Sequence, residues 1–441
     1  MNDTIGTGGA ASISKIPELR KRILFTLFIL AVYRLGSHVP TPGIDTVALG
    51  AFFDQASGTI FGVFNLFSGG ALRRFSIFAL GVMPYISSSI IMQLLTVVVP
   101  AFERLSKEGD LGRKRITQYT RYGTILLCMI QSLFIAKGLE GMRGADGVAV
   151  VLDPGMSFRI MTMITLTTGT TFIMWLGEQI TERGIGNGIS LIIYAGIAAG
   201  ILPGFANTLT LFKSGQITAF ATIFLLAIMV GAIAFIIFME RSQRRIPVQY
   251  AKRVIGRKLY GGQDSHLPLK LNSAGVIPPI FASSIILFPA TIAQYIDLPI
   301  FKHLQNIMMS RSLVYNLVYV SMIIFFTYFY TAVTFNPVDV AENLKKHGGF
   351  VPGIRPGKST SDYIDKVLTR ITLVGAIYIS LVCVLPEIMT FKFKVPFYFG
   401  GTSLLILIGV ALDTVSQIES YLLTRHYDGF IKNARLRGRR G

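Results

Sequence analysis

Charged residues and cysteines are both scarce in this sequence of 441 residues. Charged residues make up 15% of the chain, whereas a soluble domain carries about 25%. The two cysteines, Cys128 and Cys383, lie in apolar runs, which excludes a small disulfide-bonded scaffold and favours simple burial. Hydrophobic residues reach 51% and the mean hydropathy is +0.57, so the composition indicates a protein embedded in a lipid bilayer.

Catalytic motifs are also missing. The sequence has no Walker A motif, no H-E-x-x-H and no G-x-S-x-G, and the GIGNG stretch at 184–188 lacks the spacing of a dinucleotide site. The five histidines are scattered over connecting segments without the spacing of metal ligands. We therefore expect no enzyme, no cofactor and no metal site. Any work that the protein needs must come from a partner or from the membrane potential.

Long apolar runs define the expected architecture. A helix that crosses the hydrocarbon layer needs about 20 mostly apolar residues. Ten runs fit this length: 23–38, 75–99, 119–137, 156–177, 185–203, 217–239, 273–296, 313–335, 371–389 and 396–423. The sequence therefore predicts an all-α polytopic membrane protein. The first run lacks a cleavage site of the A-x-A type, so we expect it to be a membrane span and not a cleaved signal peptide.

A further apolar stretch, at 59–72, is too short to cross the bilayer and is interrupted by Gly62, Gly69 and Gly70. Such a segment is tolerated at membrane depth only where protein buries it or where it lines a cavity. The residues alone leave two interpretations open, a re-entrant segment and a loop at the membrane surface.

Lysine and arginine are distributed unevenly over the connecting segments. With ten spans, both termini share one side of the membrane with four of the connections. These segments are 1–22, 100–121, 178–184, 240–272, 336–370 and 424–441, and they hold 31 of the 42 basic residues. Because basic residues are retained on the cytoplasmic side, we expect the N-terminal segment 1–22 and the basic tail 424–441 to be cytoplasmic.

Two of the basic segments, 240–272 and 336–370, are long. Alternating apolar residues and a central glycine in the first predict a β-hairpin whose tip carries Arg257 and Lys258. Topology and anionic lipids are one explanation of the basic charge. Docking of an acidic or nucleic-acid-bearing partner is the other explanation, and the length of both loops is consistent with it.

The ten spans divide into two halves of five, 23–203 and 217–423. An odd number of spans per half turns the second half upside down, so related halves would form an inverted pair. Pro84, Pro278 and Pro279 predict kinks in the second and seventh spans.

Acidic residues and histidines are nearly absent from the middle of the spans. The polar residues that remain there are mild, among them Ser87, Gln93, Asn272 and Ser283. They fit either a helix seam that opens or ordinary hydrogen bonding between helices. Apolar residues such as Val82, Ile86, Ile193 and Ile406 lie near mid-depth, where simple packing is the plain interpretation.

Several long stretches carry a resemblance to a known family. They are PTPGID at 40–45 and the segments 64–95, 112–124, 174–190, 267–293, 338–353, 351–360 and 394–406. Over nearly the whole chain the sequence closely resembles the bacterial SecY family. The resemblance implies the large, channel-forming subunit of the Sec translocase of the inner membrane. It also implies SecE and SecG subunits beside it and a pore between two inverted halves.

The resemblance implies roles for individual residues. The apolar ring of the pore would consist of Val82, Ile86, Ile193, Ile280 and Ile406. The plug would be the 59–72 stretch, with Phe61, Phe64, Asn65, Phe67, Ser68, Gly69 and Gly70. The lateral gate would use Ser87, Gln93, Asn272 and Ser283, and the motor and ribosome surface would use Arg257, Lys258 and Arg355. Val82 stands where the family often has isoleucine, which keeps the ring apolar but removes a methylene.

The function that follows is passage of unfolded polypeptides. An apolar ring makes no specific bonds to a passing chain and excludes water when it is empty. A sideways opening would release apolar segments into lipid. The implied partners are the SecA motor, the ribosome, a preprotein with a signal sequence, and membrane lipids including anionic ones.

Two other classes of protein compete with this interpretation. A secondary transporter would need a charge or a compact polar site at mid-membrane, and a membrane-embedded enzyme would need converging His, Asp, Glu or Cys residues. Neither class explains the two long basic loops.

Overall fold

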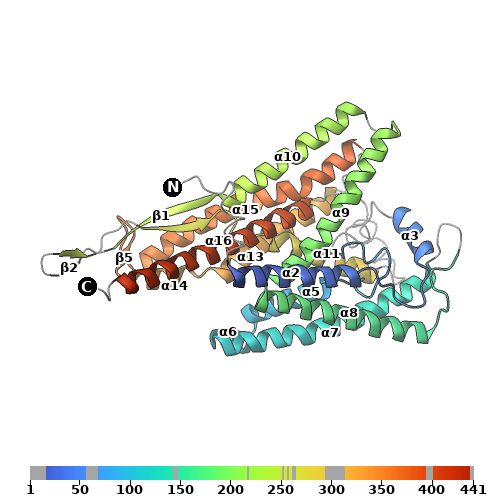
Figure 1. The fold of residues 1–441 in the computed structure, drawn as a ribbon, viewed down its shortest axis with the longest axis horizontal. Coiled ribbons are helices and arrows are strands. Elements are labelled where there is room, and N and C mark those ends of the chain that lie inside the picture. Colours follow the sequence, from blue (N-terminus) through green and yellow to red (C-terminus); the bar gives the residue numbers. More distant parts are fainter. Residues whose placement is uncertain are drawn as a thin grey trace. The chain divides into compact units, whose positions relative to one another are not determined.

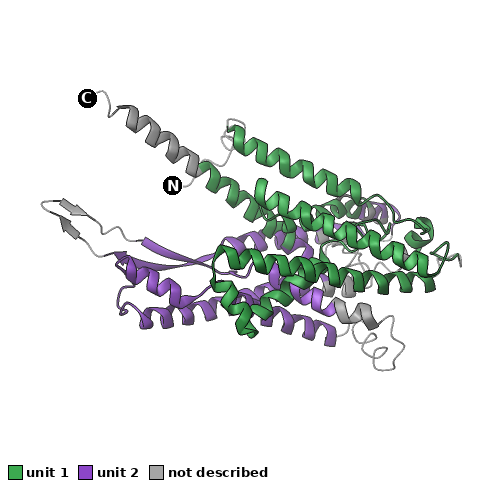
Figure 2. Ribbon diagram, turned by 90° about the horizontal axis from the view of Figure 1, so that it is seen from below, with its two compact units in different colours: residues 1–206, 294–297, 406–441 green, residues 207–293, 298–405 purple. Residues whose placement is uncertain are grey.

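The computed structural model describes residues 16–55, 68–142, 148–215, 218–250, 253–255, 258–260, 265–293, 313–393 and 401–437. The chain forms two compact units, shown in different colours in Figure 2. Unit 1 comprises residues 1–206, 294–297 and 406–441, and unit 2 comprises 207–293 and 298–405. The labels of the helices and strands are those of Figure 1.

Unit 1 is built from helices. They are α2 (Pro17–Gly36), α3 (Thr46–Gln55), α5 (Met83–Val98), α6 (Pro100–Lys107), α7 (Asp110–Gly141), α8 (Met156–Arg183), most of α9 (Gly188–Lys213) and most of α16 (Gly401–Arg437). Helix α7 packs along α5 and α8, and α2 packs on α8. Leu166 of α8 and Cys128 of α7 are among the buried core residues between these helices, so the expected burial of Cys128 is confirmed.

Unit 2 combines helices with a small sheet. Its elements are α10 (Ala219–Arg241), β1 (Gln243–Tyr250), β2 (Arg253–Ile255), β3 (Lys258–Tyr260), β4 (Ser265–Lys270), α11 (Ile277–Ala293), α13 (Leu313–Thr334), α14 (Pro337–Lys346), β5 (Gly349–Phe350) and α15 (Lys358–Phe393). Helix α13 packs against both α11 and α15, and α14 packs on α15.

Ten helices in the described part of the chain overlap the ten predicted spans. Among the described residues, seven helical stretches are long and apolar enough to cross a membrane, and α5 with α6 forms an additional apolar pair that is bent by 98°. Helix α11 is apolar but short, and α2 begins before the apolar run and includes Arg20, Lys21 and Arg22. The prediction of an all-α polytopic membrane protein is confirmed.

The second predicted span differs from expectation at its start. Residues 68–82 form turns, and the helix α5 begins only at Met83. Gly81 has φ +55°, which favours glycine, and Pro84 occupies the first turn of α5. Proline lacks an N–H and clashes with the carbonyl of the fourth residue before it, so it begins this helix and does not kink it. Pro278 and Pro279 likewise stand in the first turn of α11.

The described residues of the long basic loops form strands and a helix, and the strand pairing of the predicted hairpin is confirmed. Strands β1 and β4 pair antiparallel with Ile246 opposite Leu267, and β2 pairs with β3. The other edge of β1 pairs with β5, so one three-stranded sheet joins the loops 240–272 and 336–370. Ile246, with Leu269 of β4 and Ile364 of α15, is part of a hydrophobic core beneath this sheet. Burial of these side chains explains why the loops hold a fixed structure.

Hydrogen bonds join segments of unit 1 that are distant in the sequence. Arg22 at the start of α2 donates to the Gly184 carbonyl oxygen (3.5 Å) after α8 and to the Tyr421 hydroxyl (3.2 Å) of α16. Two segments that were predicted to share one side, 1–22 and 178–184, therefore meet within unit 1, beside Tyr421 at the end of the last predicted span. At the other connections, Ile44 forms a β-bridge with Val151.

Candidate functional site

The five predicted ring residues are all buried. Four of them lie in four different helices, and Val82 directly precedes α5. Their exposed fractions are 4% for Val82, 6% for Ile86, 4% for Ile193, 8% for Ile280 and 0% for Ile406. Four of them belong to unit 1, and Ile280 on α11 belongs to unit 2.

Local structure places the first two ring residues together. Val82 is the N-cap residue of α5, and the Ile86 N–H donates to the Val82 carbonyl oxygen (3.1 Å). The two side chains are therefore separated by about one helical turn and share one face of the chain. The backbone at Ile280 makes different contacts. Its carbonyl oxygen accepts hydrogen bonds from the Ser283 (2.9 Å) and Ser284 (2.8 Å) hydroxyls. The predicted gate hydroxyl of Ser283 thus bonds within its own helix.

The predicted plug is described only at its end. Phe61, Phe64, Asn65 and Phe67 lie outside the described residues, and residues 68–72 form turns. The predicted plug residues Ser68, Gly69 and Gly70 all belong to these turns, and both glycines have positive φ (+65° and +84°).

Two neighbouring side chains of α2 hold this turn. The Tyr33 hydroxyl donates to the Ser68 carbonyl oxygen (3.4 Å), and Arg34 Nη1 donates to the Gly69 carbonyl oxygen (2.8 Å). On its other side, a Cβ added to Gly69 would lie 2.7 Å from the Gly196 Cα of α9. The end of the predicted plug segment is therefore anchored between α2 and α9 within unit 1.

The predicted gate residues on α5 sit beside a hydrogen bond that the sequence did not single out. The Ser88 hydroxyl, next to half-buried Ser87, donates to the Thr120 carbonyl oxygen of α7 (2.8 Å). Gln93 Nε2 makes a long bond to the Ser89 hydroxyl (3.4 Å), and Gln93 Oε1 is buried without a hydrogen-bond partner among the described residues.

Asn272 takes part in a polar cluster inside unit 2. Its Nδ2 donates to Glu240 Oε1 at the end of α10 (2.7 Å) and to the Gly275 carbonyl oxygen (3.0 Å). The Tyr378 hydroxyl of α15 also approaches Glu240 Oε1 (3.5 Å). The residue is 4% exposed, yet within the described part of the chain its Oδ1 has no hydrogen-bond partner. Glu240 was not predicted, although an acid at the end of an apolar span is a visible signal.

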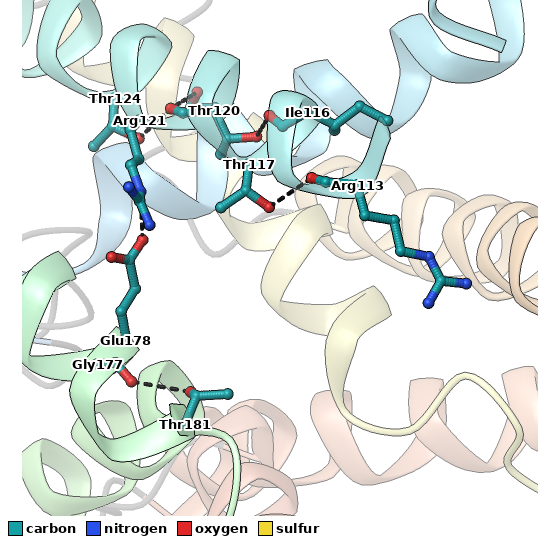
Figure 3. Close-up of polar contacts among 10 residues, drawn as sticks. Arg113, Ile116, Thr117, Thr120, Arg121, Thr124, Gly177, Glu178 and Thr181 are labelled. Carbon is teal, nitrogen blue, oxygen red and sulfur yellow. Dashed lines mark hydrogen bonds and ion pairs between the residues drawn. The ribbon is translucent and has the colours of Figure 1, made fainter. Parts of the chain in front are cut away.

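An ion pair joins α7 and α8 (Figure 3). Arg121 Nε lies 2.7 Å from Glu178 Oε1, and Figure 3 shows the two side chains pointing toward each other across the helices. The Glu178 side chain is 20% exposed and that of Arg121 is 43% exposed. The Thr120–Ser88 bond lies next to this pair along α7. Together the two contacts link α5, α7 and α8.

The predicted partner surface is partly described. Arg257 lies outside the described residues, and Lys258 begins β3. Arg355 is exposed between β5 and α15, and its carbonyl oxygen accepts from the Thr360 hydroxyl (2.9 Å). This bond holds the backbone while the guanidinium stays accessible.

Ionisable side chains are few and scattered in the part of the chain that the structure describes. It contains no group of three or more His, Cys, Asp or Glu side chains that could hold a metal ion. The arrangement there consists of buried apolar side chains, mild polar groups and a few ion pairs.

Comparison with known proteins identifies the family. The model of the SecY family matches residues 76–415, and the protein translocase subunit SecY of Escherichia coli strain K12 is 53% identical over 430 residues, which cover 96% of each chain. The chain belongs to the SecY family. The resemblance noted from the sequence is thereby confirmed.

Solved structures of SecY and Sec61 channels share the fold. One is a structure concerned with the plug domain of the SecY protein. It has a TM-score of 0.64 at 18% identity, and the match covers 93% of this chain and 96% of that chain. Another, Sec61 in a canine ribosome–channel complex, has a TM-score of 0.62 at 15% identity with the same coverage. These two comparisons concern the fold alone. The SecY family assignment rests on the sequence matches.

Proposed function

We propose that this protein is the channel-forming subunit of a bacterial protein translocase in the inner membrane. It passes unfolded polypeptides across the membrane and releases transmembrane segments sideways into lipid. The observation that carries the proposal is the match to a translocase subunit over 96% of the chain. The buried apolar side chains at all five predicted ring positions support it.

The ring acts as a seal that does not grip its substrate. Val82, Ile86, Ile193, Ile280 and Ile406 offer only aliphatic surface. Such a constriction excludes water when it is empty and forms no hydrogen bonds that would retain a passing chain. The turn at Gly69, anchored by Arg34 to α2, holds the end of the plug segment next to α9.

The gate opens because its polar contacts are weak. Hydrogen bonds between membrane helices contribute on average about 0.6 kcal/mol. The Gln93 amide bonds to Ser89 within α5, and among the described residues Gln93 Oε1 and Asn272 Oδ1 have no hydrogen-bond partner, so these groups provide little resistance to separation. An arriving apolar signal segment gains about 25 cal/mol per Å² of surface that it transfers from water to lipid.

Partners supply the energy and complete the assembly. The sheet that joins loops 240–272 and 336–370, with Arg257, Lys258 and Arg355, is the docking surface for the SecA motor and the ribosome. SecE and SecG lie beside the chain, and anionic lipids neutralise further basic residues. The excess of basic residues on these segments supports cytoplasmic termini, and the protein itself has no catalytic role.

Site-specific crosslinking tests the pore. A photoreactive residue at Ile86, Ile193 or Ile406 should crosslink to a secretory chain that is arrested in transit. The matched controls are Ile160 of α8 and Ile223 of α10, which are 44% and 68% exposed and expected to face lipid. Labelling at the controls alone would contradict the proposed path.

The lateral gate is tested separately with single cysteines at Ser87 and Ser283. Both should crosslink to a signal sequence at an early stage of export. Crosslinks only at positions remote from α5 and α11 would remove the proposed gate, without affecting the pore.

A further inference from the structure

The connection between α8 and α9, residues 184–188, is packed too tightly to admit side chains at its glycines. A Cβ on Gly184 would lie 2.5 Å from Thr26 Oγ1, and a Cβ on Gly188 would collide with the Gly177 carbonyl oxygen of α8. Gly186 has φ +87°, and a Cβ there would lie 2.8 Å from Leu191. The GIGNG stretch is therefore a close-packed connection between the two helices.

Side chains from three different helices accept hydrogen bonds from backbone N–H groups of this loop. The Ile185 N–H donates to Thr26 Oγ1 of α2 (3.1 Å), the Gly186 N–H to Gln417 Oε1 of α16 (2.9 Å), and the Gly188 N–H to Thr181 Oγ1 of α8 (2.9 Å). The loop is thus fixed by two side chains that are remote in sequence, Thr26 and Gln417, and by Thr181 of the preceding helix, all within unit 1.

The same two remote helices are tied to each other. Thr26 Oγ1 donates to the Arg22 carbonyl oxygen (2.9 Å), so its hydroxyl both donates and accepts. The Arg22 guanidinium lies 5.2 Å from the centre of the Tyr421 ring of α16. A change at Thr26 or Gln417 therefore acts on the loop and on the junction of α2 with α16.

Helix α9 is held on both sides of Ile193. Before Ile193 in the sequence, Gly188 packs on the Gly177 backbone of α8, and after it Gly196 packs on the Gly69 turn. Each helical residue advances the chain by about 1.5 Å and rotates it by about 100°. A small displacement of the loop therefore changes both the depth and the direction of the Ile193 side chain.

We propose that Thr26 and Gln417 are positioning residues of the pore seal. They accept hydrogen bonds from the Ile185 and Gly186 N–H groups, and these bonds set the position of α9 and hence of Ile193. This inference rests on the proposed function, because it assumes that Ile193 belongs to the ring. Thr26 is 8% exposed and Ile185 is 3% exposed, so this bond is shielded from water. Gln417 is exposed, so its removal is the milder change.

The test uses pairs of variants that keep or remove the acceptor. Thr26→Val and Gln417→Met keep the approximate shape without an accepting oxygen, whereas Thr26→Ser and Gln417→Glu retain one. Each variant is purified as the complete translocase, and its resting ion conductance is measured in planar bilayers. We expect a several-fold higher conductance for Thr26→Val, a smaller rise for Gln417→Met, and wild-type values for the two conservative variants.

A second measurement reports the placement of α9 directly. With Cys128 and Cys383 replaced by alanine, the rate at which a small thiol reagent labels Ile193→Cys should change several-fold in the Thr26→Val background and not in the Thr26→Ser background. If Thr26→Val fails to insert, Gln417→Met supplies both measurements.

The outcomes separate the two proposals. Wild-type conductance and labelling for Thr26→Val and Gln417→Met, beside a leaking Ile86→Ser, Ile193→Ser ring variant, would overturn the positioning role and leave the ring intact. A ring variant that does not leak would overturn the ring, and the positioning role with it. An equal leak in Thr26→Ser and Thr26→Val would show that bulk at residue 26 matters and not the acceptor, which also overturns the inference.

Discussion

The 184–188 loop and the predicted gate differ in how completely their polar groups are paired. In the loop, the N–H groups of Ile185, Gly186 and Gly188 each have a side-chain acceptor. At the gate, Gln93 Oε1 and Asn272 Oδ1 are buried, and the described residues offer them no hydrogen-bond partner. A buried polar atom without a partner costs about 1–3 kcal/mol. The 184–188 loop is therefore suited to remain in one conformation, and the predicted gate is suited to rearrange.

The largest effect is expected at the 184–188 loop, from Gly188→Ala. The added methyl group would meet the Gly177 carbonyl oxygen, and overpacking of this kind costs about 1–3 kcal/mol or more. The midpoint of thermal unfolding in detergent should fall clearly. Gly231→Ala on α10 is the control, because a Cβ there meets nothing within 4 Å and alanine favours a helix by about 1 kcal/mol. Equal stability of both variants would show that the loop is not tightly packed.

The next effect concerns the seal that the loop is proposed to hold. Ile86→Ser with Ile193→Ser should raise the resting ion conductance many-fold, because hydroxyl groups let water remain in the constriction. The matched control is Ile160→Ser with Ile164→Ser on the exposed face of α8. An unchanged current in the ring variant would assign these isoleucines to ordinary packing.

A smaller effect is expected from Arg355→Glu in the exposed loop after β5. Reversal of a charge at a docking surface slows association, and the loss depends on salt. Motor-driven export into vesicles should slow several-fold at low salt, with normal insertion of the protein. The control is Lys137→Glu, a change at an exposed residue near the C-terminal end of α7. This variant should support export at the wild-type rate. Wild-type export by Arg355→Glu would remove this residue from the docking surface.

The smallest effect is expected at the predicted gate. Gln93→Met removes a buried oxygen that has no partner among the described residues and one long bond to Ser89, so the free energy of unfolding should rise by up to about 1 kcal/mol. Export of a preprotein with a weak signal sequence should slow, since the gate opens less readily. Gln118→Met, which removes an exposed amide that donates to Tyr122, should do neither. A destabilised Gln93→Met protein would mean that Oε1 has a partner in the membrane.

Sequence patterns predicted those features that depend on neighbouring residues. The apolar runs predicted the spans, because a helix in lipid must be apolar over its whole length. Alternation around Ile246 and Val248 predicted the hairpin, because successive side chains of a strand face opposite ways. The start of α5 was placed too early, since the hydropathy continues through residues 75–82 while Gly81 and Pro84 delay the helix.

Contacts between distant segments were not predicted. The pairing of β1 with β5, the Glu240–Asn272 contact and the Arg121–Glu178 ion pair each join segments that carry no shared signal. Asn272 was predicted as a gate residue from its polarity and from the resemblance to the SecY family. The structure adds that its amide group holds the end of α10 to the start of α11.

The amino-acid sequence by itself determined the family, the membrane class, the number of apolar runs and the segments in which basic residues gather. The last three are sums of local hydropathy and charge, which solvent and lipid act on directly. Only the tertiary structure decided which acceptor serves which N–H group, as when Gln417 meets Gly186 across 231 residues of chain. The physical reason is that a hydrogen bond needs atoms within about 3 Å of each other, and only packing brings remote residues that close.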